Sequence, residues 1–195
     1  MLTGIDHQLF LFLNSFHSPF WDMVMTIISY PPTWIPLYIA ILIFLVIKYK
    51  RRMIVLVIVI ALLITASDQL SDVIKNSVKR PRPCYEKTLE GKVHTVNGRC
   101  GGMYGFVSSH ASNSFAVALL SLLMFRRRWF SISIVAWALA VGYSRIYLGV
   151  HYPGDVLFGS LFGALTGWAA FLLFDFTDRR LLMKSSFFYP VPKET

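Results

Sequence analysis

The sequence predicts an all-α membrane protein: a polytopic helical bundle with about five transmembrane helices, preceded by interfacial helices. Hydrophobic residues make up 55% of the 195-residue chain and charged residues only 15%, against roughly 25% charged residues in an average soluble domain. The apolar residues stand in long blocks, which is typical of chains whose solvent is lipid. This length accommodates one domain, so we expect residues 1–195 to form a single integral-membrane domain.

The N-terminal segment, 1–30, contains no Lys or Arg. Apolar residues recur at helical spacing within residues 5–13, which favours a helix that lies in the membrane interface. A second apolar piece, 20–28, stops before a pair of prolines. At about 1.5 Å per residue neither piece crosses a hydrocarbon core of roughly 30 Å. We therefore expect two interfacial or re-entrant helices, and, because no cleavable signal peptide is visible, insertion directed by the first true span.

Five blocks are long enough to be considered as spans. They are residues 33–47, 53–78, 109–125, 129–147 and 156–174. Several fall short of the ~20 residues of a typical span, so polar extensions at their ends are expected to complete the crossing. In the last block Gly159, Gly163 and Gly167 recur at four-residue spacing, a strip of small residues that predicts close helix packing.

The distribution of Lys and Arg predicts the orientation. Eleven of the nineteen cations fall in 48–52, 126–128 and the C-terminal tail, 175–195, all on one side of the membrane. That side is expected to be cytoplasmic, since the cytoplasmic loops of membrane proteins carry an excess of Lys and Arg. The long polar loop, 75–108, then faces the extracytoplasmic side. The net charge of +9 is explained by topology signals and lipid headgroup contact rather than by nucleic-acid binding.

Both cysteines of the chain, Cys84 and Cys100, lie in this loop. Because the extracytoplasmic compartment is oxidising, we predict a disulfide between them. Two free thiols are the alternative.

The polar residues that stand out gather at the outer ends of the spans. A transporter would place such groups near the bilayer midplane instead. Lys75, Arg82 and Arg145 supply three cations beside two histidines and two serines. Guanidinium groups match phosphate oxygens in a bidentate manner and lysine acts as a point charge, so this cluster predicts a phosphate ligand. The other charged residues on the helical stripe of Lys75 are interpreted as an ion-paired helix end: Asp68, Asp72 and Lys79.

Two short segments contain the candidate anion-binding and catalytic residues. Ser108, Ser109 and His110 begin an apolar helix, and the start of a helix is an anion site even where Ser108 also caps it. His151 and Asp155 flank a turn that leads into the last span. Asp155 is placed to cap that helix and also to accept a hydrogen bond from one nitrogen of His151, which fixes the tautomer and leaves the other nitrogen free to attack.

In order and spacing these residues resemble the type-2 phosphatidic acid phosphatase superfamily of membrane lipid phosphatases. Its pattern is K-x6-R-P, then P-S-G-H, then S-R-x5-H-x3-D. The first part corresponds to residues 75–83 and the third, complete, to residues 144–155. The second departs twice, with Val107 in place of Pro and Ser109 in place of Gly. The three motifs together are far more specific than any one of them.

The resemblance implies a helical bundle and a two-step displacement without a metal ion or other cofactor. His151 would attack phosphorus to form a phosphohistidine, with Asp155 orienting it. His110 would protonate the leaving oxygen and then activate water. The phosphoryl oxygens would be held by Lys75, Arg82, Ser108, Ser109 and Arg145.

The substrate class implied is a lipid phosphate mono- or diphosphate ester of the undecaprenyl diphosphate, lipid A or phosphatidylglycerophosphate type. We expect a bacterial inner-membrane enzyme with its site on the extracytoplasmic side, and no obligatory protein partner. A lipid phosphotransferase with the same site stays open, as does a non-catalytic transporter or scaffold. A vanadate-dependent haloperoxidase would share the pocket, but those proteins look soluble.

Overall fold

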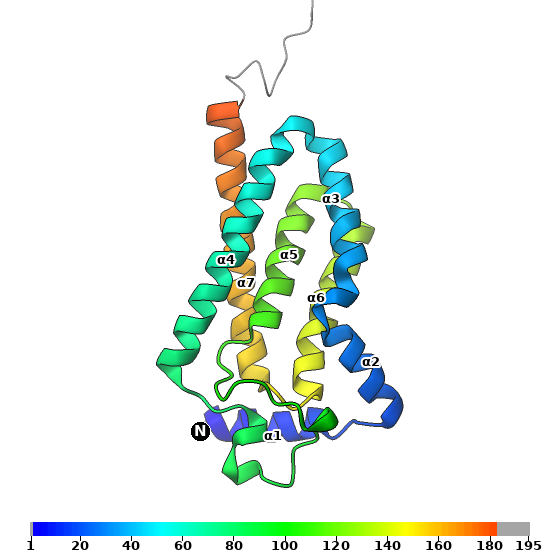
Figure 1. Cartoon of the computed structure of the whole chain (residues 1–195), viewed down its shortest axis with the longest axis vertical. Coiled ribbons are helices and arrows are strands. Elements are labelled where there is room, and N and C mark those ends of the chain that lie inside the picture. Colours follow the sequence, from blue (N-terminus) through cyan, green and yellow to red (C-terminus); the bar gives the residue numbers. More distant parts are fainter. Residues whose placement is uncertain (1, 183–195) are drawn as a thin grey trace, which may run out of the picture.

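In the computed structural model, which describes residues 2–182, the chain folds into seven α-helices without a strand in that range. The helices are α1 (Leu2–Asn14), α2 (Pro19–Ser29), α3 (Ile35–Tyr49), α4 (Met53–Val78), α5 (Ser109–Phe125), α6 (Arg128–Tyr147) and α7 (Pro153–Thr177). Helices α3 to α7 run along the long axis of the molecule, and α1 lies across one end of them (Figure 1). The predicted all-α membrane bundle is confirmed.

The five helices of the bundle coincide with the five predicted spans to within a few residues. Three segments are long and apolar enough to cross a membrane: Pro31–Val78, Arg128–Tyr147 and Pro153–Arg180. The first contains both α3 and α4, which are joined by the short turn Lys50–Arg52. Helix α5 is a shorter apolar helix of 17 residues. The side chains that point outward from α3, α4, α6 and α7 are largely apolar and exposed, as expected of surfaces that face lipid.

The two N-terminal helices have the lengths that their sequences predict. Helix α2 begins at Pro19, where proline costs no hydrogen bond, and Ser18 caps it by accepting from the Trp21 amide. On α1 the apolar side chains of Ile5, Leu9 and Phe12 are exposed. An exposed apolar face on a helix that crosses the end of the bundle is the arrangement of a helix lying in the interface.

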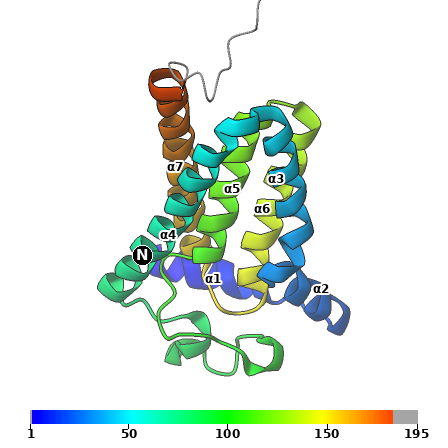
Figure 2. The same ribbon diagram turned by 45° about the horizontal axis from the view of Figure 1, so that its top comes forward.

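The two ends of the bundle differ in what they carry. At one end lie α1, α2, the loop from residue 79 to residue 108 and the turn between α6 and α7 (Figures 1 and 2). At the other end lie the turns at 50–52 and 126–127 and the end of α7. Of the predicted tail, residues 175–177 belong to α7 and 178–182 form one further turn. The remainder, with Lys184 and Lys193, lies outside the described residues.

The centre of the bundle is the packing of α5 along α7. The glycine strip of α7 makes this contact, because each glycine faces the backbone of α5. A Cβ atom at Gly159 would lie 2.6 Å from the carbonyl oxygen of Ser108, and one at Gly163 would overlap the carbonyl group of Ser112. The two helices therefore approach as closely as their backbones allow, which holds the start of α5 against the start of α7.

Replacing Gly163 with alanine is expected to destabilise the protein by about 1–3 kcal/mol, the range of overpacked cores. The added methyl group meets backbone, which cannot rotate away, so α5 and α7 must separate. A lower melting temperature in detergent, followed by tryptophan fluorescence, measures the effect. Gly4→Ala is the matched control, because no atom lies within 4 Å of a Cβ at Gly4. Equal melting temperatures for the two variants would contradict the packing argument.

Candidate active site

Three of the predicted site residues meet in one cavity of about 340 Å³ at the loop-bearing end of the bundle. Arg82 enters from the loop, His110 from the first turn of α5 and Arg145 from the last turn of α6. Arg82 also lines a neighbouring cavity of about 260 Å³, and Lys75 reaches that second space from the end of α4. The cationic groups are therefore drawn together from segments that lie up to 70 residues apart in the sequence.

His151 is not among the residues that line these two cavities; it lies next to Arg82 and is almost completely buried, only 2% exposed. Its Nε2 atom faces the guanidinium of Arg82, 3.3 Å from Nη1. Its Nδ1 atom lies 3.6 Å from Oδ2 of Asp155, which is longer than a hydrogen bond. Burial lowers the pKa of His151 to about 4, although Asp155 acts in the opposite direction. The imidazole is consequently neutral at neutral pH, and one ring nitrogen carries a free electron pair.

Asp155 is fully buried and performs the capping role that its position predicts. Its Oδ2 atom accepts a hydrogen bond of 3.0 Å from the amide of Tyr152, at the first turn of α7. The backbone of Gly105 covers it from the loop: a Cβ at that position would lie 3.1 Å from Oδ2 of Asp155 and 3.5 Å from Nδ1 of His151. Glycine thus lets the loop close over the histidine–aspartate pair.

Arg82 and Arg145 are the two guanidinium groups of the cavity. Arg82 donates to the carbonyl oxygen of Val150 at 3.4 Å, and Arg145 donates to the hydroxyl of Ser29 on α2. Each keeps a buried Nε–H group that has no hydrogen-bond partner among the described residues. An unpaired buried donor is costly unless a ligand completes it, so both groups are suited to an anion.

The serines and Lys75 lie beside this centre. Lys75 donates to the Ser109 hydroxyl at 2.5 Å and forms an ion pair of 3.0 Å with Asp72. Ser109, which departs from the family pattern, thus contacts a cation directly. Ser108 is fully buried; its hydroxyl accepts from the amide of Ala111, and its amide donates to the carbonyl oxygen of Asp155 at 3.1 Å.

His110 completes the group. Arg145, His151, Arg82 and Lys75 are all near enough to interact with its ring electrostatically. Within residues 2–182, no group of three or more His, Cys, Asp or Glu side chains is arranged to hold a metal ion. Val107, the other departure from the pattern, is a buried apolar residue and offers no group for chemistry.

Arg80 is a site residue that the sequence analysis missed. It donates to Oδ1 of Asp155 at 2.7 Å and to Oδ2 of Asp6 on α1 at 2.6 Å, and its guanidinium stacks on the Tyr152 ring. Asp6 also accepts from the amide of Gly154 at 2.9 Å. A signal was present, since Arg80 stands within the first motif and Asp6 is an acidic residue on an apolar helix. Their pairing across 74 positions was not predictable from spacing.

The ends of the loop from residue 79 to residue 108 are drawn together. The Arg82 amide donates to the Met103 carbonyl oxygen at 3.0 Å and the Gly105 amide to that of Arg80 at 2.9 Å. The structure joins Cys84 to Cys100, with their Cα atoms 6.2 Å apart. Arg82 is thus held at the base of a closed loop.

That this disulfide forms in the native membrane stays a prediction. In unreduced membranes both cysteines are expected to resist alkylation, and after reduction both should react. The closed loop should stabilise the protein by roughly 3 kcal/mol, so the reduced protein should melt earlier. Full alkylation of both thiols in native membranes would rule the bridge out.

A model of the PAP2 superfamily matches residues 52–179, about two thirds of the chain. The chain belongs to the PAP2 superfamily. This PAP2 protein is a membrane lipid phosphatase, and thus a phosphoric ester hydrolase: the family, the site and its relatives agree on that class.

Two relatives are similar to this PAP2 protein over nearly its whole length. A lipid A 4'-phosphatase of Bacteroides thetaiotaomicron is 42% identical over 98% of this chain and 84% of the relative. A lipid A 4'-phosphatase of Porphyromonas gingivalis is 32% identical over 93% and 78%. Among solved structures, that of Aquifex aeolicus LpxE superposes with a TM-score of 0.65 at 26% identity, covering 84% of this chain and 92% of that one.

Proposed function

We propose that this protein removes the 4'-phosphate of lipid A, and that residues 1–195 form a single domain for that reaction. The observation that carries the proposal is the 42% identity to a lipid A 4'-phosphatase over 98% of the chain. That similarity includes α1 and α2, which lie outside the segment matched by the family model. These two helices provide Asp6 and Ser29, which contact Arg80 and Arg145. The shared region thus extends to the parts that surround the site.

We further propose that the protein lies in a bacterial inner membrane with its site on the extracytoplasmic side. Support comes from the cations that lie at the opposite end of the bundle, in the turns at 50–52 and 126–127 and at 179–180. Basic residues concentrate in cytoplasmic loops. The disulfide-linked loop at the site end agrees with an oxidising compartment.

In the first chemical step His151 is the nucleophile. Its Nε2 atom faces Arg82, which lines the cavity, while Nδ1 is directed toward Asp155. The electron pair of Nε2 attacks phosphorus, the bond from phosphorus to the lipid oxygen breaks, and His110 gives a proton to that oxygen. The Nδ1–H group is stabilised by Asp155 as the ring gains charge. Hydrogen bonds of this kind often shorten only when the substrate is bound.

In the second step His110 removes a proton from water. The water oxygen attacks phosphorus, the bond to Nε2 breaks, and inorganic phosphate leaves with His151 neutral again. Through both steps Arg82 and Arg145 hold the equatorial oxygens, with their unpaired Nε–H groups as donors. Lys75 adds charge from the adjoining cavity, and the hydroxyl of Ser109 and the start of α5 complete the anion site.

Because three protein cations counter the phosphoryl charge, activity is expected to persist in excess EDTA. Vanadate should inhibit, since it resembles the five-coordinate phosphoryl group. Initial rates with and without chelator measure the first effect, and a vanadate titration the second. Loss of turnover on chelation, with recovery on adding Mg²⁺, would contradict this mechanism.

The substrate is tested with the purified full-length chain in detergent, without added protein or nucleic acid. Lipid A, undecaprenyl diphosphate, phosphatidylglycerophosphate and phosphatidate are compared by kcat/KM, and mass spectrometry locates the phosphate lost from lipid A. Release of the 4'-phosphate with the highest kcat/KM is the expected result. Phosphate recovered on a second lipid rather than in solution would indicate a phosphotransferase. Preference for a non-glycosylated lipid would overturn the proposal.

A further inference from the structure

The cavity that contains Arg82, His110 and Arg145 extends well beyond these three residues. Its remaining lining comes from α2 and the start of the next turn, and from the disulfide-linked loop. The residues of this lining include Thr26, Tyr30, Asn97, Arg99 and Cys100. About 340 Å³ is several times the space of a single phosphate, so the mouth of the cavity has room for the group to which the phosphate is attached.

The two walls of this outer part offer complementary polar groups. Tyr30 and Thr26 present an aromatic ring and a hydroxyl from one side, and both are exposed. Asn97 and Arg99 present an amide and a guanidinium from the other, also exposed. Among the described residues that line the cavity none is acidic, and no carboxylate forms an ion pair with Arg99. The space is therefore suited to a hydroxylated and anionic group.

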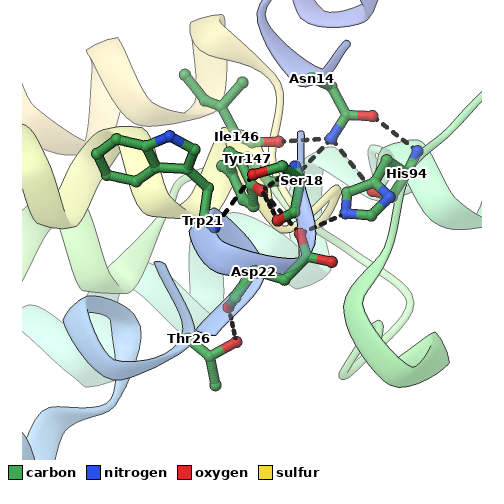
Figure 3. A network of polar contacts seen from close by, with 8 residues as sticks. All are labelled: Asn14, Ser18, Trp21, Asp22, Thr26, His94, Ile146 and Tyr147. Carbon is green, nitrogen blue, oxygen red and sulfur yellow. Dashed lines mark hydrogen bonds and ion pairs between the residues drawn. The ribbon is translucent and has the colours of Figure 1, made fainter. Parts of the chain in front are cut away.

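A network of polar contacts holds these walls in place (Figure 3). Oδ1 of Asp22, on α2, lies 2.8 Å from Nε2 of His94 in the loop and accepts from the Tyr147 hydroxyl at 2.7 Å. The His94 amide donates to Oδ1 of Asn14 at 2.8 Å. The Asn14 amide in turn donates to the carbonyl oxygens of Ile146 and Tyr147, next to Arg145. The loop is thus fastened to α2 through Asp22, and to α1 and the end of α6 through Asn14.

The other fastening is the link between Cys84 and Cys100, and Cys100 itself lines the cavity. Asn97 and Arg99 lie between the two fixed points, His94 and Cys100. Ordering such a loop before the substrate arrives lowers the entropy lost on binding. The outer part of the cavity is accordingly preorganised, although no residue in it takes part in the proposed chemical steps.

We propose that this outer part is a headgroup subsite, which binds the sugar and a further anionic group of a phosphorylated glycolipid. Arg99 binds the second anionic group, Asn97 exchanges hydrogen bonds with sugar hydroxyls, and the Tyr30 ring packs against the sugar. The Thr26 hydroxyl donates to the Asp22 carbonyl oxygen and accepts from a sugar hydroxyl. This inference rests on the proposed function and specifies how its substrate is selected. A lipid phosphate without a sugar would leave the subsite to water.

The position of the subsite relative to the membrane surface agrees with a glycolipid substrate. Helix α2, one of its walls, exposes Phe20, Met23 and Ile27. Apolar side chains on a short helix with a polar opposite side place that helix at the headgroup boundary. The sugar of a glycolipid lies at the same level, so it can enter the subsite while the acyl chains remain in the membrane.

The test compares Arg99→Gln, Arg99→Lys and Lys92→Gln with the wild-type chain. Bisphosphorylated lipid A in detergent is one substrate, and p-nitrophenyl phosphate, which has no sugar, is the other. Lys92 is an exposed cation of the same loop that does not line the cavity, so it is the matched control. The measured quantity is the ratio of kcat/KM for lipid A to kcat/KM for the small ester, with melting temperatures recorded to verify folding.

Arg99→Gln is expected to lower this ratio about tenfold, chiefly through KM for lipid A, because it removes one charge-assisted hydrogen bond. Arg99→Lys should keep most of the ratio, and Lys92→Gln should leave it as in the wild type. An unchanged ratio in Arg99→Gln, or an equal loss on both substrates, would overturn the subsite while the proposed function stands. A wild-type protein that cleaves the small ester and another lipid phosphate but not lipid A would overturn both.

Discussion

Replacing His151 with alanine is expected to reduce hydrolysis of every substrate to background. The imidazole is buried next to Arg82, and no other nucleophilic side chain takes its place there among the described residues. Without it the covalent route is lost, rather than slowed. The measurement is the rate of inorganic phosphate release from lipid A and from p-nitrophenyl phosphate, with folding verified by the melting temperature.

A second measurement identifies the intermediate. Rapid quenching of the wild-type reaction in base should preserve a phosphate that is labile in acid, and peptide mapping should place it on His151. His17→Ala is the control for a histidine at the same end of the bundle, since His17 is exposed and stacks on His94 outside the cavity. It should retain most activity. Full activity of His151→Ala, or phosphate mapped to His110, would refute the assignment.

Replacing His110 with alanine should have a large but substrate-dependent effect. Loss of a general acid or base lowers rates by typically ~10²–10⁴-fold. The loss should be near the upper end for lipid A, whose sugar oxygen leaves poorly without a proton. With p-nitrophenyl phosphate it should be smaller, because p-nitrophenolate departs with little protonation. The comparison of the two substrates therefore separates proton transfer from a general loss of structure.

The same variant should accumulate the intermediate, since water is no longer activated while attack by His151 persists. A burst of p-nitrophenolate close to one per enzyme, followed by slow turnover, would be seen in stopped-flow absorbance. An equal loss on both substrates with no burst would instead indicate that His110 serves binding or folding, and the proposed division of labour would be wrong.

The spans and their order could be predicted from the sequence, because hydrophobicity is a local property and each span needs only its own residues to become a helix in lipid. The same holds for helix starts and ends. Ser108 caps α5 and Asp155 caps α7 through atoms only three residues away. The motif residues are predictable for a similar reason, since each motif is defined by residue types at fixed separations in the sequence.

Contacts between segments that are distant in the sequence could not be predicted from such local patterns. Arg80 stands between Lys75 and Arg82 in the first motif, and nothing in its local sequence indicates that it pairs with both Asp6 and Asp155. Asn14 directly follows the apolar pattern of residues 5–13, which predicts a helix in the interface, yet it is buried and donates to a carbonyl oxygen at the end of α6. Lys75, which the sequence groups with Arg82 and Arg145, shares the neighbouring cavity with Arg82 and donates to Ser109, while Arg145 lines the other cavity.

These differences have one physical cause. Local helix formation and membrane insertion leave open how α1, α2 and the loop pack on the end of the bundle, and that arrangement depends on pairings across 72 to 148 positions. An arginine or an asparagine looks the same in the sequence whether it faces water or a buried carboxylate. Folding brings it to a partner, because an unpaired polar group is costly to bury, and so creates the cavity in which a phosphate can be held.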